Sequence, residues 1–135
     1  MTLTLRVLAP DQSVYDGSAD EVILPSTTGQ LGILTGHVSM LTALDPGVVR
    51  LRQGGDWQAI AVSGGFAEVQ SNEVTVLVNA AELGTSIDAS AAAQELDKAQ
   101  QAVAGFEGQP NSPDKVKAQM ALSRARARVS AARGS

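Results

Sequence analysis

The chain has 135 residues, of which 44% are hydrophobic and 18% charged, and its net charge is −4 at neutral pH. This length and apolar content suit one folded domain with a small appendage, and they exclude a disordered or collagen-like chain. Without cysteine the chain holds no disulfide, Cys-ligated zinc or thiol nucleophile, and its single histidine, His37, excludes a multi-histidine metal site. The acidic balance and the 3% aromatic content argue against direct binding of nucleic acid or anionic lipid.

No apolar run approaches the ~20 residues that a membrane-spanning helix needs. The first residues alternate polar and apolar side chains, and they lack the basic stretch and apolar block of a secretory signal. We therefore expect a soluble protein of a reducing compartment, whose association with a membrane goes through another protein.

Residues 1–85 alternate short apolar runs with turn residues, a pattern that predicts β-strands. The predicted strands cover residues 3–8, 22–24, 48–52, 57–62, 66–69 and 73–78. Gly54 and Gly55 separate two of them and predict a tight hairpin. Because no stretch of a dozen residues here has helical spacing, we predict a sandwich or flattened barrel of antiparallel strands.

Residues 86–135 are rich in alanine and predict two helices, at about 88–104 and 113–132. Asp88 is a candidate N-cap for the first helix, and Ser112 followed by Pro113 is a candidate start for the second. A short loop between the helices makes them antiparallel neighbours. The predicted fold class is therefore α+β, an N-terminal antiparallel β-sandwich followed by a C-terminal antiparallel two-helix hairpin.

Each predicted helix carries an apolar stripe made mostly of alanine. The first stripe is Ala92, Leu96, Ala99, Val103 and Phe106, and the second is Ala118, Leu122, Ala125, Val129 and Ala132. Alanine buries little area, at ~25 cal/mol per Å², so the contact between the helices is weak although each helix forms readily. The hairpin is then either an arm that leaves its support at low cost or a hairpin docked permanently on the sandwich.

The second helix is also basic, with six basic residues and one acid in residues 112–135. Lys117, Arg124 and Arg128 lie along one edge of its apolar stripe, and Lys115, Arg126 and Arg133 lie along the other. This pattern suits a groove with acidic walls in a partner protein, and it also suits a solvated basic face. Nucleic acid fits less well, because no aromatic residue lies between the charges.

Known catalytic patterns are missing from the sequence. It has no phosphate-binding loop and no nucleophile elbow, and His37 follows a glycine in a loop, as a packed or hydrogen-bonded structural histidine would. Asp20 and Glu21 are adjacent, and neighbouring strand residues point to opposite faces, so we do not expect an acid–base pair. The sequence predicts a non-enzymatic protein-binding part without cofactor or metal; the alternatives are a stand-alone β-sandwich adaptor with a basic helical tail and a small hydrolase or isomerase.

Several segments resemble the epsilon subunit of F-type ATP synthases, in its cyanobacterial and chloroplast branch. The segment of residues 22–37 reads VILPSTTGQLGILTGH, and residues 64–69 read GGFAEV with Asn72 shortly after. Residues 80–82, followed by Ile87 and Asp88, complete the match. These segments occur in order over about residues 5–90, which makes the resemblance more specific than any single motif.

The resemblance implies a non-catalytic central-stalk subunit that couples proton-driven rotation to ATP synthesis. In that family the sandwich holds the gamma subunit and rests on the ring of c subunits, while the helices reach the alpha and beta subunits and inhibit ATP hydrolysis. The implied contacts to gamma and the c ring lie in a loop, at Thr28, Gly29, Gln30, Leu31 and His37. The implied inhibitory arm carries Lys117, Arg124, Arg126 and Arg128. The implied location is peripheral, on the cytoplasmic or stromal face of a thylakoid or plasma membrane.

One departure from the family concerns nucleotide binding. Members that bind ATP on this subunit show an I/L-D-x-x-R-A motif, whereas this chain reads Ile87-Asp88-Ala89-Ser90-Ala91-Ala92. Because alanine replaces the arginine, a cation that would face a phosphate is missing. We predict weak or no ATP binding by the isolated chain, and micromolar affinity in calorimetry would contradict this.

Overall fold

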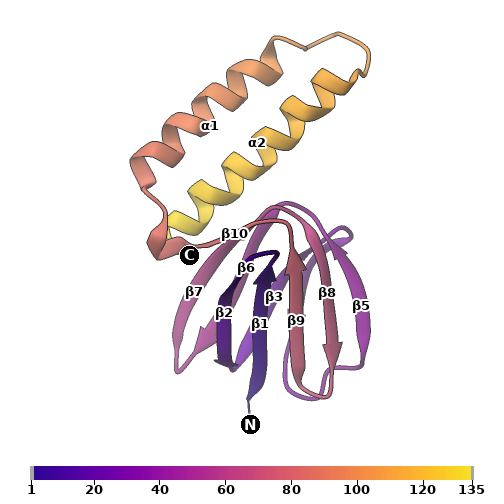
Figure 1. Ribbon diagram of the computed structural model, residues 1–135, viewed down its shortest axis with the longest axis vertical. Helices are drawn as coiled ribbons and strands as arrows, with labels where there is room; N and C mark the ends of the chain where they lie inside the picture. The colour runs from indigo at the N-terminus through magenta and orange to yellow at the C-terminus, as the bar shows by residue number, and fades with distance from the viewer. Residues whose placement is uncertain (1, 135) are drawn as a thin grey trace.

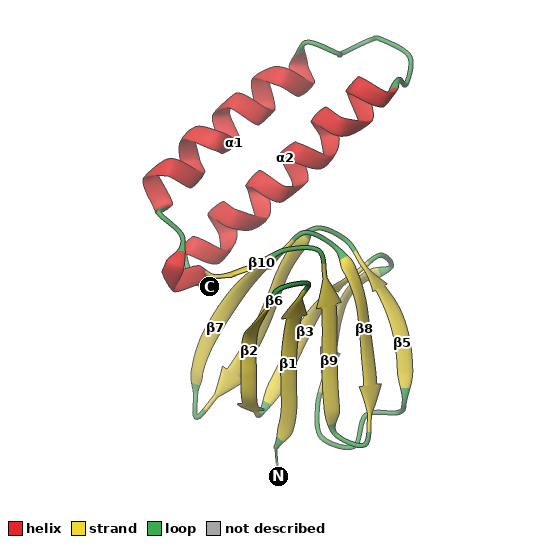
Figure 2. Ribbon diagram, viewed as in Figure 1, coloured by secondary structure: helices red, strands yellow, loops and turns green. Residues whose placement is uncertain are grey.

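The computed structural model describes residues 2–134, as a strand-rich body that carries a helical hairpin (Figures 1 and 2). The strands are β1 (Leu3–Ala9), β2 (Gln12–Ala19), β3 (Glu21–Ser26), β4 (Gly29–Ile33), β5 (Met40–Leu44), β6 (Gly47–Gln53), β7 (Asp56–Val62), β8 (Gly65–Gln70), β9 (Glu73–Val78) and β10 (Ala81–Leu83). A 3-10 turn, η1 (Gly84–Ser86), leads to α1 (Ala89–Ala104) and α2 (Pro113–Ala132). The predicted α+β class, a β-sandwich followed by a helical hairpin, is confirmed.

The strands pair in the order β10-β7-β6-β3-β5-β8-β9-β1-β2, with β4 added beside β3. The path bends between β3 and β5, which share the single pair Ser26–Leu44, and β10 approaches β2 at the other end. The expectation of purely antiparallel strands needs one correction, because β1 and β9 run parallel, with Leu5 beside Val74. A parallel neighbour needs a long connection, and here almost the whole sandwich sequence separates the two strands.

The core lies between the layers and is built by strict alternation. Along β1, Leu3, Leu5 and Val7 are buried, while the residues between them are half-exposed. In β9, Val74 and Val76 are fully buried and Leu77 is exposed. Branched aliphatic side chains on the inner faces therefore fill the space between the two layers.

Four strands were missed by the sequence pattern: β2, β4, β5 and β10. The segment from Thr28 to His37, expected to be a loop, is half strand, since β4 occupies Gly29–Ile33. Gly29, Gln30 and Gly32 are exposed, so this strand offers little apolar alternation to detect. Pairing with β3 forms the strand, and local preference contributes little.

The predicted turn and caps are confirmed. Gly54 and Gly55 form the two-residue turn between β6 and β7, with φ of 60° and 91°. Asp88 Oδ1 accepts a hydrogen bond from the Ala91 N–H at 3.1 Å, and Ser112 Oγ accepts one from the Lys115 N–H at 3.1 Å. These caps satisfy backbone donors that the first turn of each helix leaves open.

The predicted stripe on α2 is only partly right. Leu122 and Ala125 are buried as expected, but the other buried residues are Ala127 and Ala131, which the stripe omitted. The reason is that α2 has neighbours on two sides. It lies between α1 and the strands β6 and β7 (Figure 1), so it buries a second face against the sandwich.

Candidate protein-binding surfaces

The hairpin rests on the sandwich through small side chains. Ala127 and Ala131 of α2 belong to a buried cluster with residues of the sandwich and of the linker before α1. The cluster also contains Val48, Ala59, Ala61, Ile87 and Ala92. It is separate from the main core of the sandwich, so the hairpin is attached at a small apolar contact.

Gly84 makes this close approach of α2 to the sandwich possible. A Cβ atom built on Gly84 would lie 2.2 Å from the carbonyl oxygen of Ala131 and 3.0 Å from that of Ala59. Any side chain at this position would therefore force the end of α2 and the sandwich apart.

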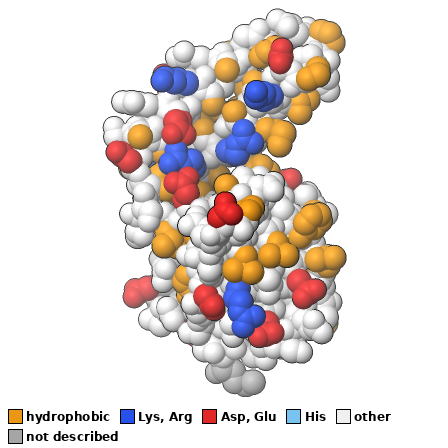
Figure 3. Space-filling model, in the orientation of Figure 1, with side chains coloured by type: hydrophobic (Ala, Val, Ile, Leu, Met, Phe, Trp, Pro, Cys, Tyr) orange, Lys and Arg blue, Asp and Glu red, His pale blue; other side chains and the backbone are white. Residues whose placement is uncertain are grey.

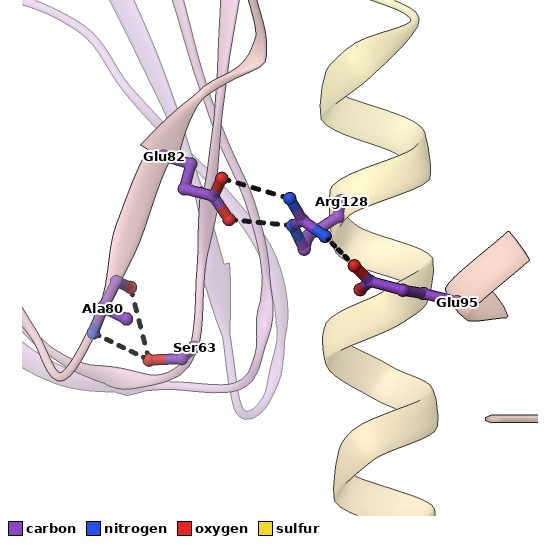
Figure 4. A network of polar contacts seen from close by, with 5 residues as sticks. All are labelled: Ser63, Ala80, Glu82, Glu95 and Arg128. Carbon is purple, nitrogen blue, oxygen red and sulfur yellow. Dashed lines mark hydrogen bonds and ion pairs between the residues drawn. The ribbon is translucent and has the colours of Figure 1, made fainter. Parts of the chain in front are cut away.

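Arg128 connects three parts of the molecule (Figure 4). Its Nε donates to Glu82 Oε1 at 2.8 Å and its Nη2 donates to Glu82 Oε2 at 3.2 Å, which makes a bidentate pair with β10. Its Nη1 donates to Glu95 Oε1 of α1 at 2.6 Å. We call Arg128, Glu82 and Glu95 the ionic hub, since they join α2 to both α1 and the sandwich.

The surroundings of the hub position Glu82 and keep Arg128 charged. Ser63 Oγ accepts from the Ala80 N–H at 2.9 Å and donates to the Ala80 carbonyl at 3.2 Å, just before β10 begins (Figure 4). The hydrogen bonds that Arg128 donates to Glu82 and, second, to Glu95 raise the pKa of Arg128 above its usual value. The guanidinium therefore stays charged, and salt weakens its ion pairs by screening.

A small hollow of about 80 Å³ lies beside the hub, lined by residues that include Ser63, Glu82, Arg124 and Arg128. Pockets for drug-sized ligands have volumes of roughly 300–1,000 Å³. Because Arg128 is already paired with two carboxylates, this hollow offers a phosphate group little room and a partly neutralised cation. Weak or absent ATP binding by the isolated chain stays a prediction.

The other arm residues singled out from the sequence remain apart from the hub. Lys117, Arg124 and Arg126 are exposed, and they make no ion pair with any of the residues that the structure describes. Arg124 lies one turn before Arg128 and lines the same hollow, whereas Arg126 lines a cleft on the other side that contains Arg50 and Ser130. The structure thus separates the internally paired Arg128 from the three solvent-facing cations.

The five residues expected to contact gamma and the c ring lie along β4 and the loop after it. Thr28 precedes the strand and its hydroxyl lies 3.1 Å from Ser26 Oγ, while Gly29 and Gln30 are exposed. Leu31 is half-buried against the core. His37 is held in the following loop, where its Nδ1 lies 2.8 Å from the carbonyl oxygen of Val38. These residues line one edge of the sandwich without forming a pocket of their own.

An apolar row that sequence reasoning missed crosses the outer face of the sandwich. Register places Leu8 of β1 beside Leu77 of β9, Leu77 beside Phe66 of β8, and Phe66 beside Ala43 of β5. Phe66 is 58% exposed and Leu77 53% exposed, and hydrophobic side chains gather on this side of the body in Figure 3. The sequence did carry a signal for this row, because Leu77 is apolar at a position that strand alternation between Val76 and Val78 assigns to the outer face.

The apolar row, defined as Leu8, Leu77, Phe66 and Ala43, borders a hollow of about 350 Å³. Its lining includes Pro10, Gly65 and Asn79 besides Leu8, Phe66 and Leu77. Exposed aromatic and aliphatic side chains that rim a hollow are typical of surfaces that bind another protein.

The two adjacent carboxylates lie differently from what was expected. Asp20 lies between β2 and β3, and both it and Glu21 reach Arg52, at 3.7 Å and 3.5 Å. The rule that neighbouring strand residues point to opposite faces fails here because the chain bends between the strands. Both carboxylates are paired with a guanidinium, which gives them a structural role.

Comparison with known proteins accounts for the whole architecture. A family model for the ATP synthase delta/epsilon chain β-sandwich domain matches residues 2–84, and one for the long alpha-helix domain of the same chain matches residues 85–133. The chain belongs to the ATP synthase delta/epsilon chain family. The predicted resemblance is thereby confirmed.

Curated relatives span the chain from end to end. A protein of Synechococcus sp. strain CC9902 named ATP synthase epsilon chain is 71% identical over 133 residues, which cover 98% of each chain. The protein of the same name from Prochlorococcus marinus strain MIT 9303 is 63% identical and covers 97% of this chain and 98% of its own length. These relatives place the chain among family members of the cyanobacterial type.

Solved structures share the fold. A chain of the Euglena gracilis mitochondrial ATP synthase, OSCP/F1/c-ring, has a TM-score of 0.79 at 22% identity and covers 97% of this chain and 81% of its own. A chain from the central stalk/c-ring of the Tetrahymena thermophila mitochondrial ATP synthase has a TM-score of 0.60 at 16% identity, over 97% of this chain and 96% of its own.

Among the residues that the structure describes, neither helix is both long and apolar enough to cross a bilayer.

Proposed function

We propose that the chain is a non-catalytic central-stalk subunit of an F-type ATP synthase, which couples rotation to ATP synthesis and inhibits ATP hydrolysis through its helices. The observation that carries this proposal is the match of both family models in order, over residues 2–84 and 85–133. The names of the Synechococcus and Prochlorococcus relatives and the central-stalk setting of the Tetrahymena chain support it. The chain is then peripheral to a thylakoid or plasma membrane, on its cytoplasmic or stromal face.

The gamma subunit docks on the apolar row in this proposal. The row exposes Phe66 and Leu77 beside a hollow large enough for a partner side chain, and an obligate partner would cover such a surface. The neighbouring row of outward residues contains Arg6, Thr75 and Glu68, which would form a polar border on one side, and it ends at Leu41, which is 70% exposed and extends the apolar surface. Thr28, Gly29, Gln30, Leu31 and His37 then lie at the edge that faces gamma and the c ring.

The helical hairpin is the inhibitory element in this proposal. Lys117, Arg124 and Arg126 face solvent on α2, where they are available to acidic groups of the alpha and beta subunits. The small alanine-lined contact with the sandwich supports a hairpin that detaches at low cost. Arg128 joins these contacts only after the hairpin has left the sandwich, since Glu82 and Glu95 hold it in the form described here.

A binding experiment with matched variants tests the docking surface. Replacing Phe66 and Leu77 with serine is expected to weaken capture of purified gamma subunit by about tenfold or more, because it removes the centre of an apolar contact. Both side chains are exposed, so we expect the variant to keep its fold. Titration of labelled chain with gamma measures the effect.

The control variant is Val116→Ser on α2, which removes a similarly exposed apolar side chain from the hairpin. It is expected to bind gamma as the unmodified chain does. Equal affinity of all three proteins would show that gamma docks elsewhere on the sandwich. Failure of the unmodified chain to bind gamma would contradict the proposed function itself and would favour a stand-alone adaptor.

A further inference from the structure

The ionic hub is placed where it controls both contacts of α2. Glu82 belongs to the sandwich and Glu95 to α1, so one guanidinium holds α2 to two bodies at once. Other contacts between the hairpin and the sandwich include an alanine-lined cluster and a hydrogen bond of 3.0 Å from Arg50 Nη2 to Ser130 Oγ. The hub thus supplies two directional contacts between the hairpin and the sandwich, both from Arg128 to Glu82, and one between the two helices, from Arg128 to Glu95.

We propose that Arg128 is a switch residue: its pair with Glu82 latches the hairpin to the sandwich, its bond to Glu95 holds α2 to α1, and both carboxylates are exchanged for those of a partner when α2 is released. This inference rests on the proposed function, because it takes the inhibitory partner to be an acidic protein surface. It adds to that function an internal competitor for the arm, made of two named carboxylates of this chain.

The exposure of the three side chains makes such an exchange inexpensive. Arg128 is 26% exposed, while Glu82 is 44% and Glu95 53% exposed. Each carboxylate hydrates readily once Arg128 leaves it, so neither becomes a buried unpaired charge. Without an acidic partner, the latch favours the docked hairpin. With such a partner, the guanidinium exchanges its internal carboxylates for carboxylates of the partner, so it keeps a full set of charged acceptors.

The position of Arg124 sets the order in which a partner can pair with the two arginines. It lies one turn before Arg128, lines the same hollow and faces solvent in the docked form. An acidic helix of a partner can therefore pair with Arg124 while the hub is intact and with Arg128 afterwards. The partner surface that fits is one with carboxylates spaced by about one helical turn.

Hydrogen exchange of the α2 backbone in the isolated full-length chain tests the latch directly. Glu82→Gln removes the bidentate partner and is expected to speed exchange across α2 roughly three- to tenfold, while Glu95→Gln has a smaller effect. Glu73→Gln is the matched control, since Glu73 pairs with Arg6 at 3.6 Å on the sandwich, away from the hairpin. Unchanged α2 exchange in both hub variants would overturn the proposal.

Inhibition of ATP hydrolysis in the reconstituted complex tests the exchange of partners. Glu82→Gln is expected to strengthen inhibition, because the hairpin leaves the sandwich more easily. Arg128→Gln is expected to speed α2 exchange in the isolated chain and yet to inhibit less than Glu82→Gln, because it loses the contact made after release. Equal inhibition by these two variants would show that Arg128 does not move to a partner.

A steric variant separates the latch from charge effects. Gly84→Ala places a methyl group against the Ala131 carbonyl while it keeps every charge of the hub, so it is expected to speed α2 exchange and to strengthen inhibition as Glu82→Gln does. A wrong proposed function gives a different result from a wrong latch. In that case removal of the whole hairpin would leave ATP hydrolysis unchanged, while hydrogen exchange of α2 in the isolated chain would still respond to Glu82→Gln.

Discussion

Deleting residues 112–135 is expected to raise ATP hydrolysis by the reconstituted complex about fivefold or more while gamma binding stays intact. The deletion removes α2 with all its basic residues and therefore the contacts by which the arm would obstruct rotation. The apolar row and β4 lie on the sandwich, so we expect the proposed binding to gamma and the c ring not to depend on α2. Steady-state hydrolysis and gamma titration measure the two effects.

The structure shows why the shortened chain is expected to fold. The sandwich has a core of its own, separate from the cluster under α2, so the deletion uncovers that small cluster, with Ala59, Ala61 and Ile87, and leaves the main core covered. It also leaves α1 without its neighbour, and a second truncation after Ser86 removes that helix as well. If both shortened proteins bind gamma and hydrolysis stays at the level of the full complex, the hairpin is not the inhibitor.

Replacing Leu5 with alanine is expected to lower the free energy of unfolding by about 2–5 kcal/mol. Leu5 is fully buried at the centre of β1, between β2 and β9, and its loss leaves a cavity that the two layers cannot close. Domains of this size are stable by about 5–15 kcal/mol, so a large part of the stability would be lost. Chemical denaturation of the isolated chain measures the change.

Leu77→Ala is the control for this prediction, because the side chain removed is the same and lies on the outer face, where it is 53% exposed. We expect a change within about 0.5 kcal/mol. A large loss of stability for Leu77→Ala would mean that the apolar row supports the fold, and it would weaken the proposal that the row is a docking surface for gamma.

The missed strands show where sequence patterns stop being informative. β1 and β9 were predicted because their alternation is recorded in consecutive residues, as in Leu3, Leu5 and Val7. β4 was not, because Gly29, Gln30 and Gly32 carry no such pattern and the strand forms only by pairing with β3. A strand of this kind depends on its neighbour, and its own sequence does not specify it.

The second face of α2 is a similar case. A single periodic stripe was predicted, but alanine occurs on more than one side of this helix, at positions that include Ala125, Ala127 and Ala131. Alanine favours a helix wherever it stands, and it does not indicate which side will be covered. Burial of Ala127 and Ala131 follows from docking on β6 and β7.

The amino-acid order alone determined the properties that depend on near neighbours: strand alternation, the glycine turn, the caps at Asp88 and Ser112, the alanine-rich helices and the family. The tertiary structure decided what lies together across long separations. It placed Leu8 beside Leu77 in the apolar row, and it brought Arg128 to Glu82 and Glu95, which lie 46 and 33 residues away. The physical reason is that local periodicity fixes the conformation and inner face of each element, whereas strand register and helix docking are set by the packing of distant segments.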